Sequence, residues 1–294
     1  MEAIIESILS GMLMGGIYGL TAVGLTMIFG VMKVINFAHG SLLMVGMFAA
    51  YWFVKLTNLN PYLALIVVVP ALFGFGYLMQ HFVIRPVFQA EKDVREPITV
   101  IIVTTGIWYI LDNLALMLFG AEYRVVQTSV TGKIFELGDI YLLQPKVYGF
   151  IIALATTAIL SWFLSRTRMG KAIRATSLDR DAASLMGINQ YQIYNLAFGI
   201  GTAVCGVAGC VLVPFYYVYP SVGVVFDIRA FIIVVLGGLG SIPGALLGGI
   251  IIGIIESVGA QFMAATWTEE IIYALFLLIL FVKPSGLFGH RQDF

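Results

Sequence analysis

The residues of this sequence that could bind a polar molecule are few, and they interrupt long apolar runs. Residues 36–41 read Asn-Phe-Ala-His-Gly-Ser and separate the first two apolar segments. Such a stretch predicts a discontinuous helix, whose free amides and carbonyls can meet a substrate where they line a cavity. A second Gly-Ser step interrupts another apolar segment. The candidate pathway residues are therefore Asn36, His39, Gly40, Ser41, Gly240 and Ser241.

Two carboxylates, Asp112 and Glu256, lie well inside apolar runs. A charge at the centre of a membrane helix costs about 2.5–3.5 kcal/mol on insertion scales, so each should face a cavity or a partner, or be neutral. Asn113 directly follows Asp112 and is a candidate partner. A cavity or proton-relay role is one interpretation. A hydrogen bond between helices or subunits is the other, and we prefer it.

No group of residues predicts catalysis or a metal site. His39 has no base, nucleophile or metal ligand at a suitable spacing, so we expect a structural role beside the pathway. Cys205 and Cys210 lie in one apolar run and are interpreted as packing residues. The sequence has no Walker-type phosphate-binding motif, so any dependence on ATP and magnesium must come from a partner.

The composition is that of an integral membrane protein. Of the 294 residues, 60% are hydrophobic and 11% are charged, against about 25% charged in soluble domains. We expect an all-α polytopic bundle that forms a single transmembrane domain over residues 1–294. The net charge of zero argues against nucleic acid as a partner. Glu2 and Glu6 are unlike the basic start of a secretory signal, so the first apolar segment should be a retained span.

Apolar segments lie at 4–30, 40–56, 61–84, 98–120, 147–165, 193–218, 228–262 and 270–282. The segment 228–262 is too long for one span of about 20 residues, and glycines and a proline interrupt it at 237–244. Splitting it there gives nine spans, with eight to ten compatible with the pattern. The second segment is short enough to be a re-entrant pass.

Basic residues predict the orientation, because Lys and Arg favour cytoplasmic loops. With the N-terminus outside and the C-terminus in the cytoplasm, the inner loops hold Lys33, Arg85, Lys92, Arg95, Arg166, Arg168, Lys171, Arg174, Arg180, Lys283 and Arg291. The outer side then keeps Lys55, Arg124, Lys133, Lys146 and Arg229. This excess favours a multi-pass protein with that orientation.

Two loops are long enough to have roles of their own. Loop 121–146 should be external, as a small hairpin or docking surface or as a plain connector. Loop 166–192 should be internal and contain a short helix that Asp179 caps and Gly187 ends. Ala182, Leu185 and Met186 then share one face of that helix. That face either docks into a partner's groove or lies on the membrane surface.

Glycines recur every four residues in two of the apolar segments. The sets are Gly11, Gly15 and Gly19, and Gly240, Gly244 and Gly248. This spacing lets two helix backbones approach closely, so both segments should pack tightly against a neighbour.

Several blocks of the sequence resemble the branched-chain amino acid (LIV) type of ABC transporter permease, in its LivH-like form. The blocks are 24–40, 169–175 with 181–183 and 186–188, 234–249 and 283–289, and they follow the family order. The resemblance implies that loop 166–192 is the coupling loop to an ATPase. Its candidate contact residues are Gly170, Arg174, Asp181, Ala182, Ala183, Leu185 and Gly187. Asp181 stands where many importers have glutamate.

The resemblance also implies a division of labour in the cell inner membrane. This chain would be a non-enzymatic permease subunit beside a second, LivM-like permease. Two cytoplasmic ABC ATPase subunits would hold ATP and magnesium, and a periplasmic substrate-binding protein would deliver the substrate. Leucine, isoleucine or valine is the expected substrate, and urea, short amides or other amino acids are alternatives.

Two other classes of function are alternatives to an importer permease. An ion-coupled secondary transporter would need carboxylates near the membrane centre, for which Asp112 and Glu256 are the candidates. An intramembrane enzyme would use His39, but no catalytic constellation accompanies it.

Overall fold

The structure is a computed structural model of the chain. It describes all residues except 1, 92–97, 128–130, 139, 284–285 and 289–294. Lys92, Arg95 and Arg291, which the sequence places in inner loops, lie outside the described residues.

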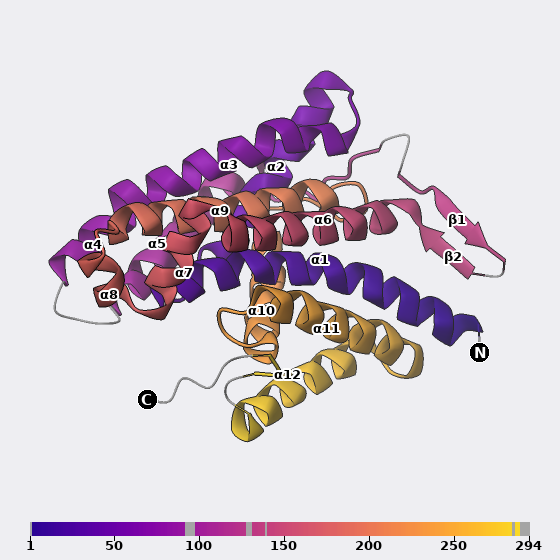
Figure 1. Ribbon diagram of the computed structural model, residues 1–294. Coiled ribbons are helices and arrows are strands. Elements are labelled where there is room, and N and C mark those ends of the chain that lie inside the picture. Colours follow the sequence, from indigo (N-terminus) through magenta and orange to yellow (C-terminus); the bar gives the residue numbers. More distant parts are fainter. Residues whose placement is uncertain (1, 92–97, 128–130, 139, 284–285, 289–294) are drawn as a thin grey trace.

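Helices account for nearly all of the regular structure in the described residues (Figure 1). They are α1 (Glu2–Met32), α2 (His39–Thr57), α3 (Leu65–Met79), α4 (Arg85–Ala90), α5 (Thr99–Phe119), α6 (Gln144–Arg166), α7 (Arg168–Leu178), α8 (Arg180–Leu185), α9 (Gln190–Leu212), α10 (Val222–Gly237), α11 (Ile242–Phe262) and α12 (Ala265–Val282). A 3-10 turn at Pro61–Ala64 precedes α3, and a π-helical turn at Gln80–Ile84 joins α3 to α4.

Seven of these segments are long and apolar enough to cross a bilayer. They are α1, α2, the continuous helical segment Pro61–Ala90, α5, α6, α9 and α11. The other two predicted spans correspond to α10, which has only 16 residues, and α12. The all-α polytopic class is confirmed, and the predicted break in segment 228–262 falls between α10 and α11.

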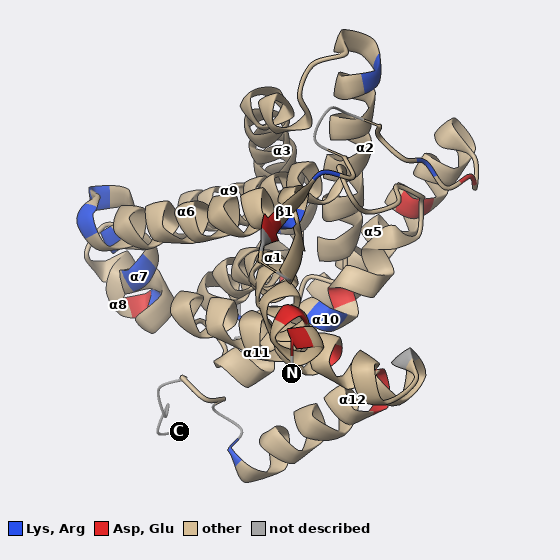
Figure 2. Ribbon diagram, turned by 90° about the vertical axis from the view of Figure 1, so that its right-hand side faces the viewer, with Lys and Arg blue, Asp and Glu red and all other residues tan. Residues whose placement is uncertain are grey.

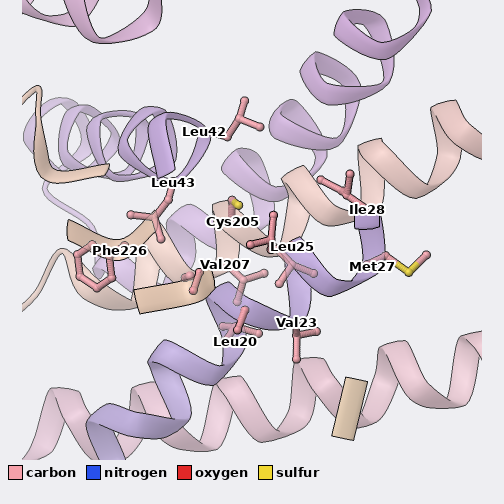
Figure 3. Close-up of a cluster of buried hydrophobic side chains, with 14 of the residues drawn as sticks. Leu20, Val23, Leu25, Met27, Ile28, Leu42, Leu43, Cys205, Val207 and Phe226 are labelled. Atoms are coloured by element: carbon pink, nitrogen blue, oxygen red, sulfur yellow. The ribbon is translucent and has the colours of Figure 1, made fainter. Parts of the chain in front are cut away.

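The core forms around α1 and α9. Both helices are apolar on all sides and are buried along most of their length, as expected for central helices. Figure 3 shows where α1, α2, α9 and α10 meet, with Leu25, Leu43, Val207 and Phe226 in one cluster. In contrast, α3, α5 and α6 keep exposed apolar faces, which suit a lipid or partner environment.

The bundle has two distinct ends. Figure 1 shows the start of α1 and a β-hairpin at one end, and α4, α7 and α8 at the other. The hairpin pairs β1 (Ile134–Leu137) with antiparallel β2 (Ile140–Leu143). Of the alternatives left open for loop 121–146, the structure shows the hairpin, and it lies opposite the loop 166–192.

Charged residues are sparse along the helices in Figure 2, and α10 is one of the helices that carry them. The sequence predicts that Arg229 lies on the outer side, at the start of segment 228–262. The structure places it within α10, where its guanidinium pairs with Glu256.

Glycines allow α1 and α11 to cross at close range. Methyl groups added at Gly11 and Gly15 would collide with the backbone of Gly253 and Gly249, and one at Gly249 with that of Gly19. The predicted close packing of the first glycine set is confirmed. In the second set, Gly244 and Gly248 pack closely against α10, as predicted, whereas Gly240 lies in the connection before α11.

We predict that Gly249→Ala destabilises the protein, because the added methyl group meets the α1 backbone. Overpacking of this kind costs about 1–3 kcal/mol, which corresponds to a fall of roughly 2–12 °C in melting temperature for a chain of this size. Thermal unfolding of the detergent-purified chain measures the effect. Gly106→Ala is the matched control, because nothing lies within 4 Å of the added methyl group. Equal melting temperatures for the two variants would contradict the packing analysis.

Candidate functional site

The chain turns back into the bundle between α1 and α2. The imidazole Nε2 of His39, the first residue of α2, lies 2.9 Å from the carbonyl oxygen of Thr21. Thr21 is eleven residues before the end of α1 at Met32, and a helix rises 1.5 Å per residue, so α2 begins about 17 Å back along α1. The predicted discontinuous helix is thus present.

Side chains satisfy the backbone of this returning segment. The Ala38 amide donates to the Asn36 side-chain oxygen over 3.1 Å. The Phe37 amide donates to the Thr104 hydroxyl of α5 over 3.4 Å. Asn36 itself is buried, and its Nδ2 has no hydrogen-bond partner. The segment 36–38 can therefore leave helical geometry inside the bundle at a tolerable cost.

His39 is enclosed by α1 and α9. Its side chain is 1% exposed, and its Nε2 lies 3.3 Å from the Cys205 sulfur. Cys205 and Cys210 are both free and buried. In the described residues, no group of His, Cys, Asp or Glu could hold a metal ion. The ring of His39 therefore joins the start of α2 to α1 and α9 as a packing and hydrogen-bonding group.

The starts of α2 and α10 touch each other through glycines. A methyl group at Gly40 would collide with the carbonyl of Gly223, and one at Gly223 with Gly40. Asp227, one turn further along α10, lies beside Gly40 and accepts a hydrogen bond from its backbone. Two helices thus begin side by side within the bundle, as glycine allows.

Asp112 of α5 is fixed beside this contact. Its Oδ1 accepts from the Ser41 hydroxyl over 2.6 Å, and its Oδ2 accepts from the Trp108 indole over 2.8 Å. The suggested partner Asn113 was wrong, because that side chain is exposed and donates to the carbonyl of Tyr109 instead. Successive helical residues point about 100° apart, so neighbours in sequence do not face each other.

Asp112 also forms part of the wall of a cavity of about 320 Å³. The other lining residues are Asn113, Leu116, Ala121, Tyr123, Tyr219, Pro220 and Ser221. Partial burial raises the pKa of Tyr219, a group in the connection before α10. Its hydroxyl therefore remains a hydrogen-bond donor at neutral pH. Asp112 is thus a cavity residue as well as an inter-helix hydrogen-bonding group.

Three residues of this site, Asp227, Trp108 and Tyr219, were not predicted from the sequence. Asp227 lies in the predicted connection between the apolar segments 193–218 and 228–262. Trp108 precedes Asp112 by one helical turn, and this spacing was the available signal. Nothing in the local sequence places Tyr219 near α5, since the two segments are far apart along the chain.

Gly240 and Ser241 lie elsewhere. Gly240 has φ of +89° and lies near Gly30, toward the end of α1. The Ser241 hydroxyl caps α11 by accepting from the Gly244 amide over 3.2 Å. The structure does not bring these two residues to the 36–41 segment, because the whole of α10 separates them. The Gly240-Ser241 step is therefore the start of α11.

Glu256 belongs to a charged cluster that joins four helices. Its Oε1 lies 2.8 Å from the Arg229 guanidinium and 3.4 Å from the Tyr18 hydroxyl. Arg229 also approaches Glu269 of α12 at 3.3 Å. The preferred interpretation of Glu256, an inter-helix interaction, agrees with this geometry.

The loop 166–192 contains two helices, α7 and α8, where one was predicted. Thr167 caps α7, and Asp179 caps α8 by accepting from the amides of Asp181 and Ala182. Gly187 has φ of +83° and ends α8, as expected. The predicted cap and stop are confirmed. The extra helix arises because Thr167 supplies a cap of its own.

The face of α8 predicted to be apolar is exposed. Leu185 is 89% and Met186 84% exposed, and Ala182 lies on the same open side. Ala183 is buried, and Arg174 and Asp181 are exposed beside the face. Gly170 lies in close contact with the α6 backbone at Phe163 and Leu164, where a side chain would collide. Gly170 therefore shapes the α6–α7 corner instead of contributing to the exposed face.

We predict that His39→Ala lowers stability without preventing membrane insertion. It removes a hydrogen bond to Thr21 and leaves a cavity beside α9, at a combined cost of about 2–5 kcal/mol. The melting temperature of the purified chain should fall by at least about 4 °C. Asn113→Ala is the control, because its side chain is exposed and bonds only within its own helix. A wild-type melting temperature for His39→Ala would contradict the structural role.

The comparisons with known proteins agree with this architecture. The sequence pattern of the family described as "Branched-chain amino acid transport system / permease component" matches residues 7–281. The chain is 30% identical to the high-affinity branched-chain amino acid transport system permease protein BraD of Pseudomonas aeruginosa, over 98% of this chain and 96% of that protein. It is equally similar to LivH of Escherichia coli K12, with the same coverage.

A third relative comes from Methanocaldococcus jannaschii. The chain is 30% identical to the probable branched-chain amino acid transport permease protein LivH of Methanocaldococcus jannaschii, over 92% of this chain and 88% of that protein. No solved structure matches the chain. Since the family pattern spans nearly the whole chain, this multi-pass membrane protein is a member of the branched-chain amino acid transport permease family.

Proposed function

We propose that this chain forms one side of the membrane pathway of an ATP-driven importer for branched-chain amino acids. The observation that carries the proposal is the match to this permease family over residues 7–281. The structure supports it with a broken, polar helix start inside an apolar bundle, next to a cavity. Such breaks are typical of transport proteins that bind substrates at membrane depth.

The exposed face of α8 supports docking of a cytoplasmic ATPase. Leu185, Met186 and Ala182 form a small apolar face with charged flanks, which fits a groove on a partner protein. The contact region would comprise Arg174, Asp181, Ala182, Leu185 and their neighbours, with Gly170, Ala183 and Gly187 giving α7 and α8 their shape. This loop is then the coupling loop.

Contacts from α8 to the core would transmit motion of the ATPases to the pathway. The Arg180 guanidinium donates to the carbonyl of Met32 at the end of α1, over 2.7 Å. The side chain of Gln190, at the start of α9, donates to the carbonyl of Arg180 over 2.8 Å. Since α1 and α9 hold the start of α2 through His39, a shift of α8 would act on the candidate site.

The proposal includes the remaining parts of the transporter. A second permease would complete the pathway, and two ATPase subunits would bind ATP and magnesium. A periplasmic binding protein would deliver substrate at the end of the bundle that carries the hairpin. The N-terminus would then lie outside and the C-terminus in the cytoplasm of an inner-membrane protein. Alternating access follows if ATP stabilises one state of the pathway over the other.

The test of the proposed function is leucine uptake by the complete transporter in proteoliposomes. We expect uptake that needs ATP, the second permease and the binding protein, and that survives dissipation of ion gradients. Uptake by this chain without ATPase subunits, which stops when the ion gradient is removed, would instead show a secondary transporter. Absence of leucine uptake by the complete wild-type complex would overturn the proposal.

We predict that Ala182→Arg leaves membrane insertion intact but uncouples ATP hydrolysis from leucine uptake. A charge at this position would enter the docking groove, and the loss of a well-packed interface contact lowers coupling about tenfold or more. The leucine transported per ATP hydrolysed measures the effect. Gln89→Arg is the control, because Gln89 is an exposed position in α4, at the same end of the bundle but outside α7 and α8. Wild-type coupling in Ala182→Arg at normal expression would rule out this docking face.

A further inference from the structure

The Asp112 carboxylate is positioned by two donors but has no cationic partner in the described residues. Ser41 donates to one oxygen over 2.6 Å and Trp108 to the other over 2.8 Å. The ion pairs of the described chain involve Arg229 with Glu256 and Glu269, and none involves Asp112. Two neutral donors do not fully offset the cost of removing an ionised carboxylate from water.

A second carboxyl group lies near this position. Asp227 is 9% exposed, its Oδ1 has no hydrogen-bond partner, and it interacts electrostatically with Asp112. None of the residues that line the cavity is a Lys, Arg or His. The region around Asp112 is therefore an attractive environment for a cation that enters the cavity.

The rest of the cavity wall suits the other parts of an aliphatic amino acid. Leu116, Ala121 and Pro220 provide apolar surface, while Asn113, Tyr123, Tyr219 and Ser221 provide neutral donors for a carboxylate. The volume of about 320 Å³ is at the lower end of the range for small-molecule sites. The cavity thus has an anionic wall, neutral donors and an apolar side.

We propose that this cavity is a substrate site of the permease in which Asp112 binds the ammonium group of the transported amino acid. The inference rests on the proposed function and deepens it. A charge-assisted hydrogen bond from an ammonium group to a positioned carboxylate is about twice as strong as one between neutral groups. The site therefore prefers a free amine to urea or a short amide, and it repels simple carboxylates. Ser41 and Trp108 are positioning residues that aim the carboxylate.

The test measures occupancy of the cavity directly, in the purified complex of this chain with its second permease and ATPases. Leu116→Cys places a thiol in the cavity wall, and the native Cys205 and Cys210 are buried. We expect L-leucine to slow labelling of this thiol by a water-soluble maleimide. The deaminated analogue 4-methylpentanoate and the neutral 4-methylpentanamide should have no such effect at the same concentration.

Adding Asp112→Asn keeps the shape of the side chain and removes its charge. The leucine concentration that gives half-maximal protection should then rise about tenfold or more. Glu122→Gln is the matched control, because it removes an exposed carboxylate beside the cavity that is absent from its wall. It should leave protection unchanged. If Leu116→Cys fails to assemble, Ala121→Cys, also in the wall, reports the same occupancy.

Three results would overturn the inference. They are protection that persists unchanged in the Asp112→Asn background, equal protection by 4-methylpentanoate, and absence of protection by leucine at both cysteine positions. Leucine uptake by the wild-type transporter distinguishes failure of the Asp112 inference from failure of the proposed function. Normal uptake combined with any of the three results would disprove the role of Asp112 and leave the permease function standing.

Discussion

The absence of water in the bilayer core constrains this structure more than any other factor. Backbone amides and carbonyls that leave a helix there must find partners in the protein. The segment between α1 and α2 does so inside the bundle, where Asn36 and Thr104 accept from backbone amides and His39 bonds to the carbonyl of Thr21. Because Thr21 belongs to α1 and Thr104 to α5, the start of α2 is fixed relative to these two helices. The same arrangement places the Ser41 hydroxyl beside Asp112, which forms part of the cavity wall.

Glycine contacts make that arrangement compatible with dense packing. The α1–α11 crossing depends on Gly15 and Gly249, and the α2–α10 contact depends on Gly40 and Gly223. In lipid there is little hydrophobic gain from association of helices, so close van der Waals contact and hydrogen bonds provide much of the stabilisation. The short helix α10 contacts α1, α2, α11 and α12. In this position Asp227 is buried beside Gly40, and the partly buried Arg229 pairs with Glu256.

The two ends of the bundle are linked through α1 and α9. At one end, Arg180 joins the exposed α8 to the carbonyl of Met32. About two-thirds of the way along α1, Thr21 bonds to His39, and Ser41, two residues after His39, binds Asp112. In the proposed transporter, a displacement of α8 would act on the cavity through these contacts. Coupling to the ATPases and recognition of the substrate would then meet at the start of α2.

The sequence by itself determined the membrane class, the division of segment 228–262, the cap at Asp179 and the stop at Gly187. These features depend on local composition and on residues close together in the chain, which is why they could be predicted. The candidate residues 36–41 and Asp112 were also found, because polar groups in apolar runs are conspicuous. Only the tertiary structure decided that Ser41 and Trp108, and not Asn113, bind Asp112. It also separated Gly240 from Gly40 and placed Arg229 inside the bundle beside Glu256. The physical reason is that these pairings join helices that are distant in the sequence. Which neighbour each side chain contacts therefore depends on how whole helices cross.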